Sequence, residues 1–158
     1  MVSADRLGRR VVTGMNGSGR SVLVGDGVSA ACTVRPDATM SVEIWCQERV
    51  PSTREESGVR AGEVVARPPE HGLSFRLFRI AGTEETEDGQ PLATQLRASD
   101  SLFVGTVVQG RAYLVLEVEE VLLEAGDSFV IPGSMPGWRN PFADHALMVC
   151  SVTALIDS

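Results

Sequence analysis

The chain has 158 residues, 43% hydrophobic and 22% charged, which is the composition of one globular domain with a sizeable core. Its formal net charge of −7 argues against nucleic acid as a partner, because binding to phosphates needs clustered cations. All 14 basic residues are Arg. Without Lys no side-chain Schiff base can form, which excludes pyridoxal phosphate enzymes and class I aldolases.

The three cysteines, Cys32, Cys46 and Cys150, are widely spaced and form no C-x-x-C motif. The first residues, MVSADRLGRR, contain no apolar segment typical of a secretory signal, and no apolar run is long enough to span a bilayer. We therefore expect reduced thiols, a cytoplasmic location and no association with membranes.

The N-terminal part alternates short apolar segments with Gly, Pro, Asn and Asp, a pattern typical of β-structure. Two such segments flank residues 15–19 (MNGSG), whose turn-forming residues predict a hairpin. Residues 47–62 are polar and carry both signs of charge, which predicts a long loop or a short surface helix. The strands predicted here are 9–13, 21–24, 30–34 and 39–46.

The C-terminal part has a denser β pattern. A turn over 67–72 precedes its first strand, an acidic loop is expected over 82–91, and Gln109-Gly110 predicts a two-residue turn. Short strands at this spacing favour a sandwich or a barrel. The strands predicted here are 74–80, 102–108, 111–118, 121–124, 128–131 and 145–154.

The stretch from Gly126 to Asn140 resembles the second sequence motif of the cupins, small β-barrel proteins that commonly hold a metal. It has a turn glycine at Gly126, a strand, a second turn at Pro132-Gly133 and a final asparagine. Gly110 is similar to the glycine that ends the first cupin motif. The resemblance covers about Arg9 to Ala154. It implies an all-β, antiparallel barrel of the jelly-roll type with an extra N-terminal hairpin, as one domain over 1–158 (N-terminal strands 8–46, core barrel 73–155).

The cupin resemblance also locates the positions where metal ligands are expected, and this chain lacks them. Pro136 stands at the histidine position of the second motif, and proline has no side-chain lone pair. Phe103 stands at the glutamate position of the first motif, and 95–99 contains no His. We therefore expect neither metal nor cofactor. An improvised site would have to use His71, His145, Glu43, Asp100, Cys46 or Cys150.

Strand alternation suggests which side chains face the barrel interior. In SVEIWC, Glu43 and Trp45 are expected on one face. If that face is internal, the Glu43 carboxylate lies in an apolar cavity and acts as a general acid or base; otherwise it faces water or pairs with Arg. Arg76 and Arg79 are on opposite faces, so at least one is expected to point toward the interior or a subunit interface. An inward Arg binds a carboxylate or an enolate-like oxygen, whereas an outward one is a solvated cation.

Tyr113 either points inward and donates to a carbonyl or lies on the strand surface. Trp138 is expected inside, as a pocket wall or as part of the core. Cys150 has no base or cation next to it in the sequence, so packing is its expected role. The predicted catalytic residues are Glu43, Arg76 and Tyr113, and the predicted substrate-binding residues are Trp45, Phe78, Phe103, Met135, Trp138, Met148 and Cys150.

The first functional interpretation is a metal-independent cyclase or isomerase that folds a flexible, apolar, polyketide-like substrate for ring closure, including pericyclic closure. The resemblance to cupins of natural-product pathways favours it. The alternative is a non-catalytic cupin that binds a small molecule in the same pocket. A second alternative, a metal-dependent dioxygenase or lyase, requires the missing ligands. The resemblance further implies a homodimer with exchanged N-terminal strands, for which the early RRVVTG segment is suited.

Overall fold

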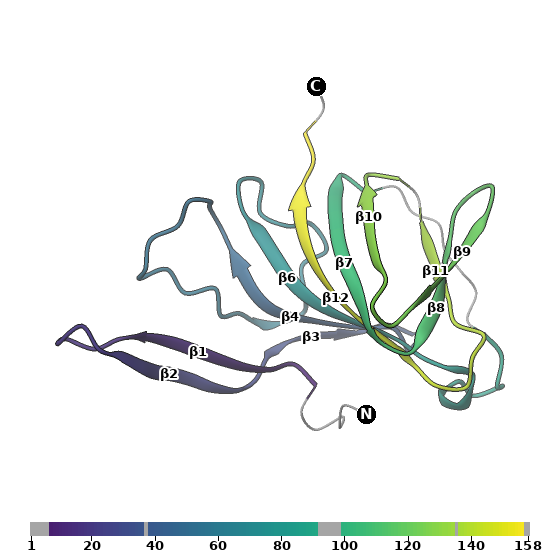
Figure 1. The fold of residues 1–158 in the computed structure, drawn as a ribbon, viewed down its shortest axis with the longest axis horizontal. Coiled ribbons are helices and arrows are strands. Elements are labelled where there is room, and N and C mark those ends of the chain that lie inside the picture. Colours follow the sequence, from purple (N-terminus) through teal and green to yellow (C-terminus); the bar gives the residue numbers. More distant parts are fainter. Residues whose placement is uncertain (1–6, 37, 92–98, 135, 157–158) are drawn as a thin grey trace.

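Antiparallel pairing between strands far apart in the sequence builds the fold (Figure 1). The computed structural model describes residues 7–36, 38–91, 99–134 and 136–156. The all-β prediction is confirmed, and the fold is cupin-like with a separate N-terminal hairpin. The strands are β1 (Arg9–Met15), β2 (Ser21–Val28), β3 (Ala30–Val34), β4 (Met40–Gln47), β5 (Ala61–Gly62), β6 (Leu73–Ile80), β7 (Ser101–Gln109), β8 (Arg111–Val115), β9 (Glu120–Glu124), β10 (Ser128–Pro132), β11 (Gly137–Arg139) and β12 (Ala146–Ala154), with one 3-10 turn, η2 (Thr83–Glu85).

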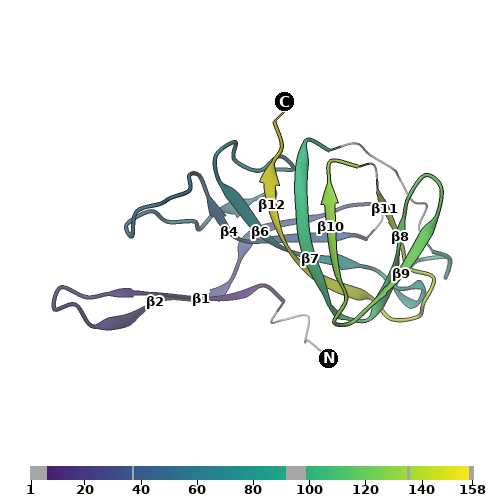
Figure 2. The same ribbon diagram turned by 45° about the horizontal axis from the view of Figure 1, so that its top comes forward.

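A curved seven-stranded sheet, in the order β10-β7-β12-β6-β4-β3-β5, forms most of the barrel wall. A three-stranded sheet, β11-β8-β9, lies across from the β7 and β10 side of it (Figure 2). Side chains from both sheets meet in one hydrophobic core. We call the face of the large sheet that contacts this core its inner face, and the opposite face its outer face.

Strand alternation explains how the core is filled. On β12, Met148, Cys150 and Val152 are at most 1% exposed, and all three belong to the core. Val107 of β7 and Ala112 of β8 are fully buried beside them. Burying each of the larger apolar side chains stabilises the fold by roughly 1.5–3 kcal/mol.

A β-bulge interrupts the alternation of β4. Glu43 pairs with Arg76 and Trp45 pairs with Phe75, so Ile44 is the extra residue. Because of this extra residue, Glu43 faces inward whereas Trp45 faces outward. The expectation that Glu43 and Trp45 share a face is therefore wrong, and its cause is a bulge that simple alternation does not anticipate.

The hairpin β1-β2 extends away from the barrel and pairs only within itself (Figures 1 and 2). The Asn16 side chain accepts hydrogen bonds from the Ser18 and Arg20 backbone N–H groups and so fixes the turn, as the sequence predicts. For residues 47–62 a loop or a surface helix was open; Gln47 ends β4, and residues 48–62 form a loop with the short strand β5 and a bridge between Arg49 and His71.

The turn residues that carry the cupin resemblance have structural roles. Gly110 adopts φ +71°, and a Cβ there would lie 2.3 Å from the His145 carbonyl oxygen, so only glycine fits. Asn140 is 2% exposed, and its Nδ2 donates to the carbonyl oxygens of Ile80 and Asp144. Asn140 therefore holds the turn that leads into β12.

Within the described residues, no helix has the length and apolar character needed to cross a membrane.

Candidate functional site

A polar row crosses the inner face of the large sheet. Register pairing places Glu43 of β4 beside Arg76 of β6, and Arg76 beside Cys150 of β12. Glu43 and Arg76 are each only 3% exposed. The structure thus brings together two of the predicted catalytic residues and one predicted substrate-binding residue.

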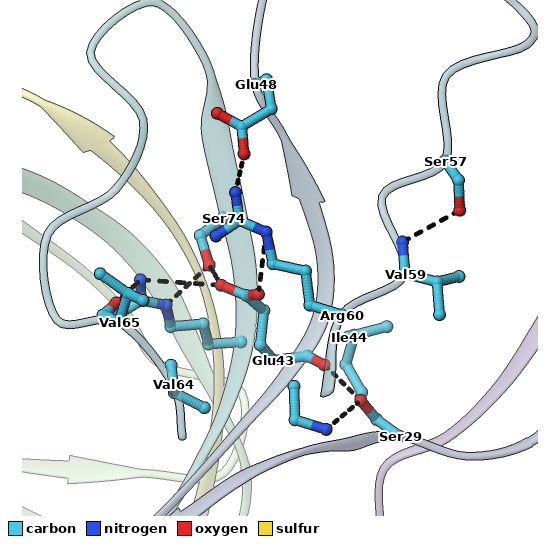
Figure 3. A network of polar contacts seen from close by, with 12 residues as sticks. Ser29, Glu43, Ile44, Glu48, Ser57, Val59, Arg60, Val64, Val65 and Ser74 are labelled. Carbon is cyan, nitrogen blue, oxygen red and sulfur yellow. Dashed lines mark hydrogen bonds and ion pairs between the residues drawn. The ribbon is translucent and has the colours of Figure 1, made fainter. Parts of the chain in front are cut away.

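Ser74 connects the two charged groups of this row. Its hydroxyl donates to Glu43 Oε2 at 2.6 Å and accepts from Arg76 Nε at 2.7 Å. Arg76 Nη2 lies 3.9 Å from Glu43 Oε2, so the carboxylate and the guanidinium also form an ion pair. Figure 3 shows the Glu43 carboxylate enclosed by Ser74 and Arg60. We call Glu43, Ser74 and Arg76 the buried polar cluster.

The remaining contacts of the buried polar cluster reach the loop before β6. Arg76 Nη1 donates to the Ala66 carbonyl at 3.1 Å and Nη2 to the Val65 carbonyl at 2.7 Å. Arg60 Nε lies 4.0 Å from Glu43 Oε1, and Arg60 also pairs with Glu48. The sequence left open whether Glu43 lies in an apolar cavity or instead faces water or pairs with Arg. The structure shows Glu43 paired with Arg, but inside the barrel rather than at the surface.

The carbonyl groups at the β4 bulge have their own donors. The Ser29 hydroxyl donates to the Glu43 carbonyl oxygen at 2.6 Å (Figure 3), and Arg10 Nη1 donates to the Ile44 carbonyl oxygen at 2.8 Å. Because both carbonyls are bonded, the bulge is held in one conformation and Glu43 keeps its inward direction.

Burial sets the ionisation of the groups around the polar cluster. It lowers the pKa of Arg76 from its ordinary value, and the nearby Glu43 carboxylate opposes this change. Burial raises the pKa of Cys150 to about 12, with Arg76 opposing it, and burial and Glu43 raise the pKa of Cys46. Both thiols therefore stay protonated at neutral pH, unlike the thiolates that act as nucleophiles.

Next to the polar cluster, aromatic side chains of both sheets border the core, Phe78 and Phe103 from the inner face and Trp138 from β11. Phe78, Phe103 and Trp138 pack against the buried core but remain half-buried, and we call these three residues the inner wall. The rings of Phe78 and Phe103 have centroids 6.5 Å apart, and Trp138 meets Phe129 edge to face at 5.2 Å. The inner wall thus unites three of the predicted substrate-binding residues, and Met148, a fourth, is buried in the core behind them.

Ser41 contributes an unsatisfied hydroxyl beside this wall. It is the register partner of Phe78, on the same face of β4 as Glu43. Its Oγ is buried and has no hydrogen-bond partner among the residues that the structure describes. A buried hydroxyl without a partner costs about 1–3 kcal/mol, which is the signature of a place that another polar group can fill.

Tyr113 and Trp45 lie apart from this assembly. Ala112 and Leu114 are the core-facing residues of β8, so Tyr113 points outward, where it stacks on Phe142 at 6.0 Å. Trp45 packs against the backbone at Gly58, where an added Cβ would lie 2.2 Å from the indole ring. The predicted catalytic set of Glu43, Arg76 and Tyr113 is therefore not assembled in one place. Met135 lies outside the described residues.

The residues present do not fit the metal centre that the cupin resemblance implies. Phe103 belongs to the apolar inner wall, and no three His, Cys, Asp or Glu side chains converge in 7–36, 38–91, 99–134 and 136–156. The carboxylate nearest the interior, Glu43, is already beside a guanidinium, and the thiols next to it are protonated. A divalent cation would meet a positive charge there instead of free ligands.

Sequence reasoning missed Ser74 and Ser41. Both could be found from alternation alone, because Ser74 shares a face with Arg76 and Ser41 shares one with Glu43. Arg60 had no such signal, because it reaches Glu43 from an irregular loop.

No protein-family model matches the chain, and no curated protein matches its sequence. Among solved structures, it is similar to the cupin domain of Schizosaccharomyces pombe Cnp3, with a TM-score of 0.54 and 9% identity over 92% of this chain and 87% of that chain.

Two weaker similarities are to a Salmonella typhimurium protein described as an ethanolamine utilization protein Q (TM-score 0.49, 13% identity, 90% and 94% covered) and to KdgF from Halomonas sp. (TM-score 0.48, 15% identity, 76% and 82% covered). At these identities the similarity to the Cnp3 domain shows the fold alone, and that fold is the cupin fold.

Proposed function

We propose that this chain binds a small, largely apolar molecule with a carbonyl or hydroxyl group on the inner face of its barrel. One observation carries the proposal: the half-buried inner wall lies beside the unsatisfied Ser41 hydroxyl. Apolar sites with a few placed polar groups are the usual construction of small-molecule pockets. Here the wall of Phe78, Phe103 and Trp138 contacts the ligand carbon skeleton, and Ser41 donates to its oxygen.

The two tryptophans of the chain allow a direct test. Trp138 is in the inner wall, whereas Trp45 packs on the outer face against Gly58. With β-ionone as an apolar ketone probe, we expect saturable quenching of the fluorescence of Trp45→Phe, which retains Trp138. The matched variant Trp138→Phe retains only the outer tryptophan and should show none. Equal quenching in both variants, or none in either, would contradict the proposal.

Ser41→Ala separates the binding role of the hydroxyl from a structural one. Removing an unsatisfied buried hydroxyl should leave the stability of the free protein unchanged or higher. The same change should weaken binding of the ketone about two- to tenfold, because a hydrogen bond contributes roughly 0.5–1.5 kcal/mol. Binding of the matching hydrocarbon should not change. A destabilised Ser41→Ala protein would show that the hydroxyl supports the fold instead.

The second candidate function is a metal-independent cyclase or isomerase acting on a polyketide-like chain. The buried polar cluster favours it, because it lies on the same face of the large sheet as Phe78, and Arg76 is two residues from Phe78 along β6. In this candidate the wall folds the substrate and the Arg76 guanidinium binds an enolate-like oxygen that forms during ring closure. Glu43 and Ser74 hold the guanidinium in place.

Turnover distinguishes the two candidates. Linear polyene ketones are incubated with the protein, and ring closure is followed by mass spectrometry and NMR. The cyclase predicts product that accumulates catalytically and is lost when the inner wall is blocked by Phe103→Trp. Stable binding without product leaves the binding function alone and contradicts the cyclase.

We also propose that the chain is a homodimer. The hairpin β1-β2 leaves Val11, Leu23 and Val24 50–61% exposed, and an isolated two-stranded hairpin is at best marginally stable in water. A second copy would cover this apolar surface. Size-exclusion chromatography with light scattering should give a dimer mass, and Leu23→Glu should shift it toward monomer. A clean monomer for the unmodified chain would contradict this proposal.

A further inference from the structure

A cavity of about 420 Å³ lies on the outer face of the large sheet, at the base of the β1-β2 hairpin. Leu7 and Val28 close it from the hairpin side, while Met40 and Val42 of β4 and Leu147 of β12 form its floor. Its volume is within the roughly 300–1,000 Å³ of small-molecule sites. We call it the outer cavity.

The sheet itself separates the outer cavity from the inner wall. Arg79 lines the outer cavity, whereas Phe78, its neighbour in the chain, belongs to the inner wall on the other face. Val42 alternates in the same way between Ser41 and Glu43. A ligand in the outer cavity is therefore distinct from one on the inner face.

Donor groups without acceptors mark one end of the outer cavity. Arg79 uses Nη2 to pair with Glu85, but its Nε and Nη1 have no hydrogen-bond acceptor within the described part of the chain. His145, which also lines the cavity, contacts the same Glu85 oxygen through Nδ1 at 3.3 Å. Glu85 is not among the lining residues, so the cavity presents the Arg79 guanidinium rather than the carboxylate.

We propose that the outer cavity binds a linear acyl carboxylate. The hydrocarbon chain contacts Leu7, Val28, Met40, Val42 and Leu147, and the carboxylate accepts hydrogen bonds from the unused Arg79 nitrogens. Among the described residues that line it there is no Phe, Tyr or Trp, so the walls suit a flexible aliphatic chain rather than a flat ring. Since the whole chain carries a net charge of −7, attraction of an anion must be local to Arg79.

The reactivity of Cys32 provides a chemical test of this proposal, because its thiol lines the cavity and is half-buried. The other two cysteines, Cys46 and Cys150, are only 2% and 1% exposed. Native protein labelled with a disulfide reagent should therefore react first at Cys32. Decanoate should slow this reaction in a saturable way, and isothermal titration calorimetry should give the same affinity. The reaction of Cys32→Ser provides the background rate.

Two variants test the two halves of the ligand. Arg79→Gln should weaken decanoate binding by at least about tenfold, because a charged hydrogen-bonding partner is lost, and should leave binding of 1-decanol unchanged. Arg111→Gln is the matched control, since Arg111 also faces a carboxylate, Glu124 at 3.9 Å, but on β8. It should bind decanoate like the unmodified protein.

Val28→Trp should block the part of the outer cavity that binds the hydrocarbon chain of the ligand. Val28 is 54% exposed, so a larger ring there should fill the cavity without displacing core residues. It should abolish protection of Cys32 by decanoate while the protein stays folded. The proposal is overturned if decanoate neither protects Cys32 nor gives heat, or if Arg79→Gln binds it unchanged. It is also overturned if Cys32 is protected without ligand and becomes reactive on dilution, since a second copy then fills the cavity.

Discussion

Two of the Glu–Arg pairs that connect different strands of this molecule lie in opposite environments, one inside the barrel and one on its surface. Glu43 and Arg76 have side chains 3% and 4% exposed and lie 3.9 Å apart, with Ser74 between them. Glu120 and Arg139 have side chains 39% and 31% exposed and form two direct hydrogen bonds, of 2.6 and 3.0 Å. By geometry alone the surface pair is the better one.

The comparison teaches that environment, more than distance, determines what such a pair does. Water solvates both charges of the surface pair when they separate, so breaking it costs little. The buried pair has no such replacement, and removing one partner leaves the other charge uncompensated in the interior. The buried pair therefore acts as a requirement of the fold, whereas the surface pair is one of many weak contacts.

The largest effect is expected from Arg76→Met. It leaves the buried Glu43 with only Ser74 and the more distant Arg60, and it removes the donors to the Val65 and Ala66 carbonyls. The free energy of unfolding should fall by about 3–5 kcal/mol, measured by urea denaturation. The control is Arg79→Met on the same strand, whose side chain is 25% exposed and faces outward. Equal, small losses in both variants would contradict the contrast.

A double-mutant cycle sharpens this result. Glu43→Gln removes the countercharge of Arg76 but keeps an acceptor for Ser74. Combined with Arg76→Met it should cost less than the sum of the single changes, by about 0.5–3 kcal/mol, because the second change removes the charge that the first leaves unpaired. Strict additivity in urea denaturation would mean that the two groups do not interact.

The buried Cys150 thiol makes the stability of the barrel interior depend on pH. Burial raises the pKa of its thiol from 9.0 to about 12, so between these values the unfolded chain releases a proton that the folded protein keeps. Stability should therefore fall as the pH rises above 9.0, by about 1 kcal/mol at pH 10 relative to pH 8. Cys150→Ala should show a shallower fall over the same range. Parallel curves would exclude this thiol as the cause.

The smallest effect is expected at the surface pair. Arg139 lowers the pKa of Glu120 through its hydrogen bond, so the contribution of Glu120 to stability is present above the ordinary carboxyl pKa of 4.5 and is lost as the pH falls through the lowered value. Glu120→Gln should therefore leave the urea midpoint at neutral pH almost unchanged. Any difference from the unmodified protein should disappear in acid and at high salt. A loss as large as that of Arg76→Met would reverse the comparison.

Local patterns were enough to predict most of the strands. The alternation in 101–109 and 146–154 and the glycines at the turns come from short-range chemistry, and the structure confirms these elements. The inward direction of Trp138 came from the cupin resemblance, in which the position of Pro136 faces the interior and Trp138 has the same parity; its ring packs on the core. For Tyr113 both orientations stayed open, because β8 is apolar on one face and mixed on the other.

The candidate site was harder to predict because it depends on contacts across long sequence separations. Arg76 contacts Glu43 across strands and the Val65 and Ala66 carbonyls across a loop without periodicity. The bulge at Ile44, which the sequence MSVEIWC does not reveal, separates Trp45 from the face of Glu43. Sequence patterns indicated which side chains were unusual, but not which of them would meet.

That bulge also divides β4 into two segments whose side chains alternate in opposite phase. Residues up to Glu43 follow one phase and residues from Trp45 follow the other, so a single inserted residue separates two independently placed halves. If Ile44 paired regularly with β6, Trp45 and Cys46 would exchange sides and an indole would enter the space of a thiol; deleting Ile44 would instead remove the bulge and leave Trp45 opposite Phe75. A lineage that lost this residue would therefore keep the inward and outward side chains of β4 as they are, and would lose only the bulge.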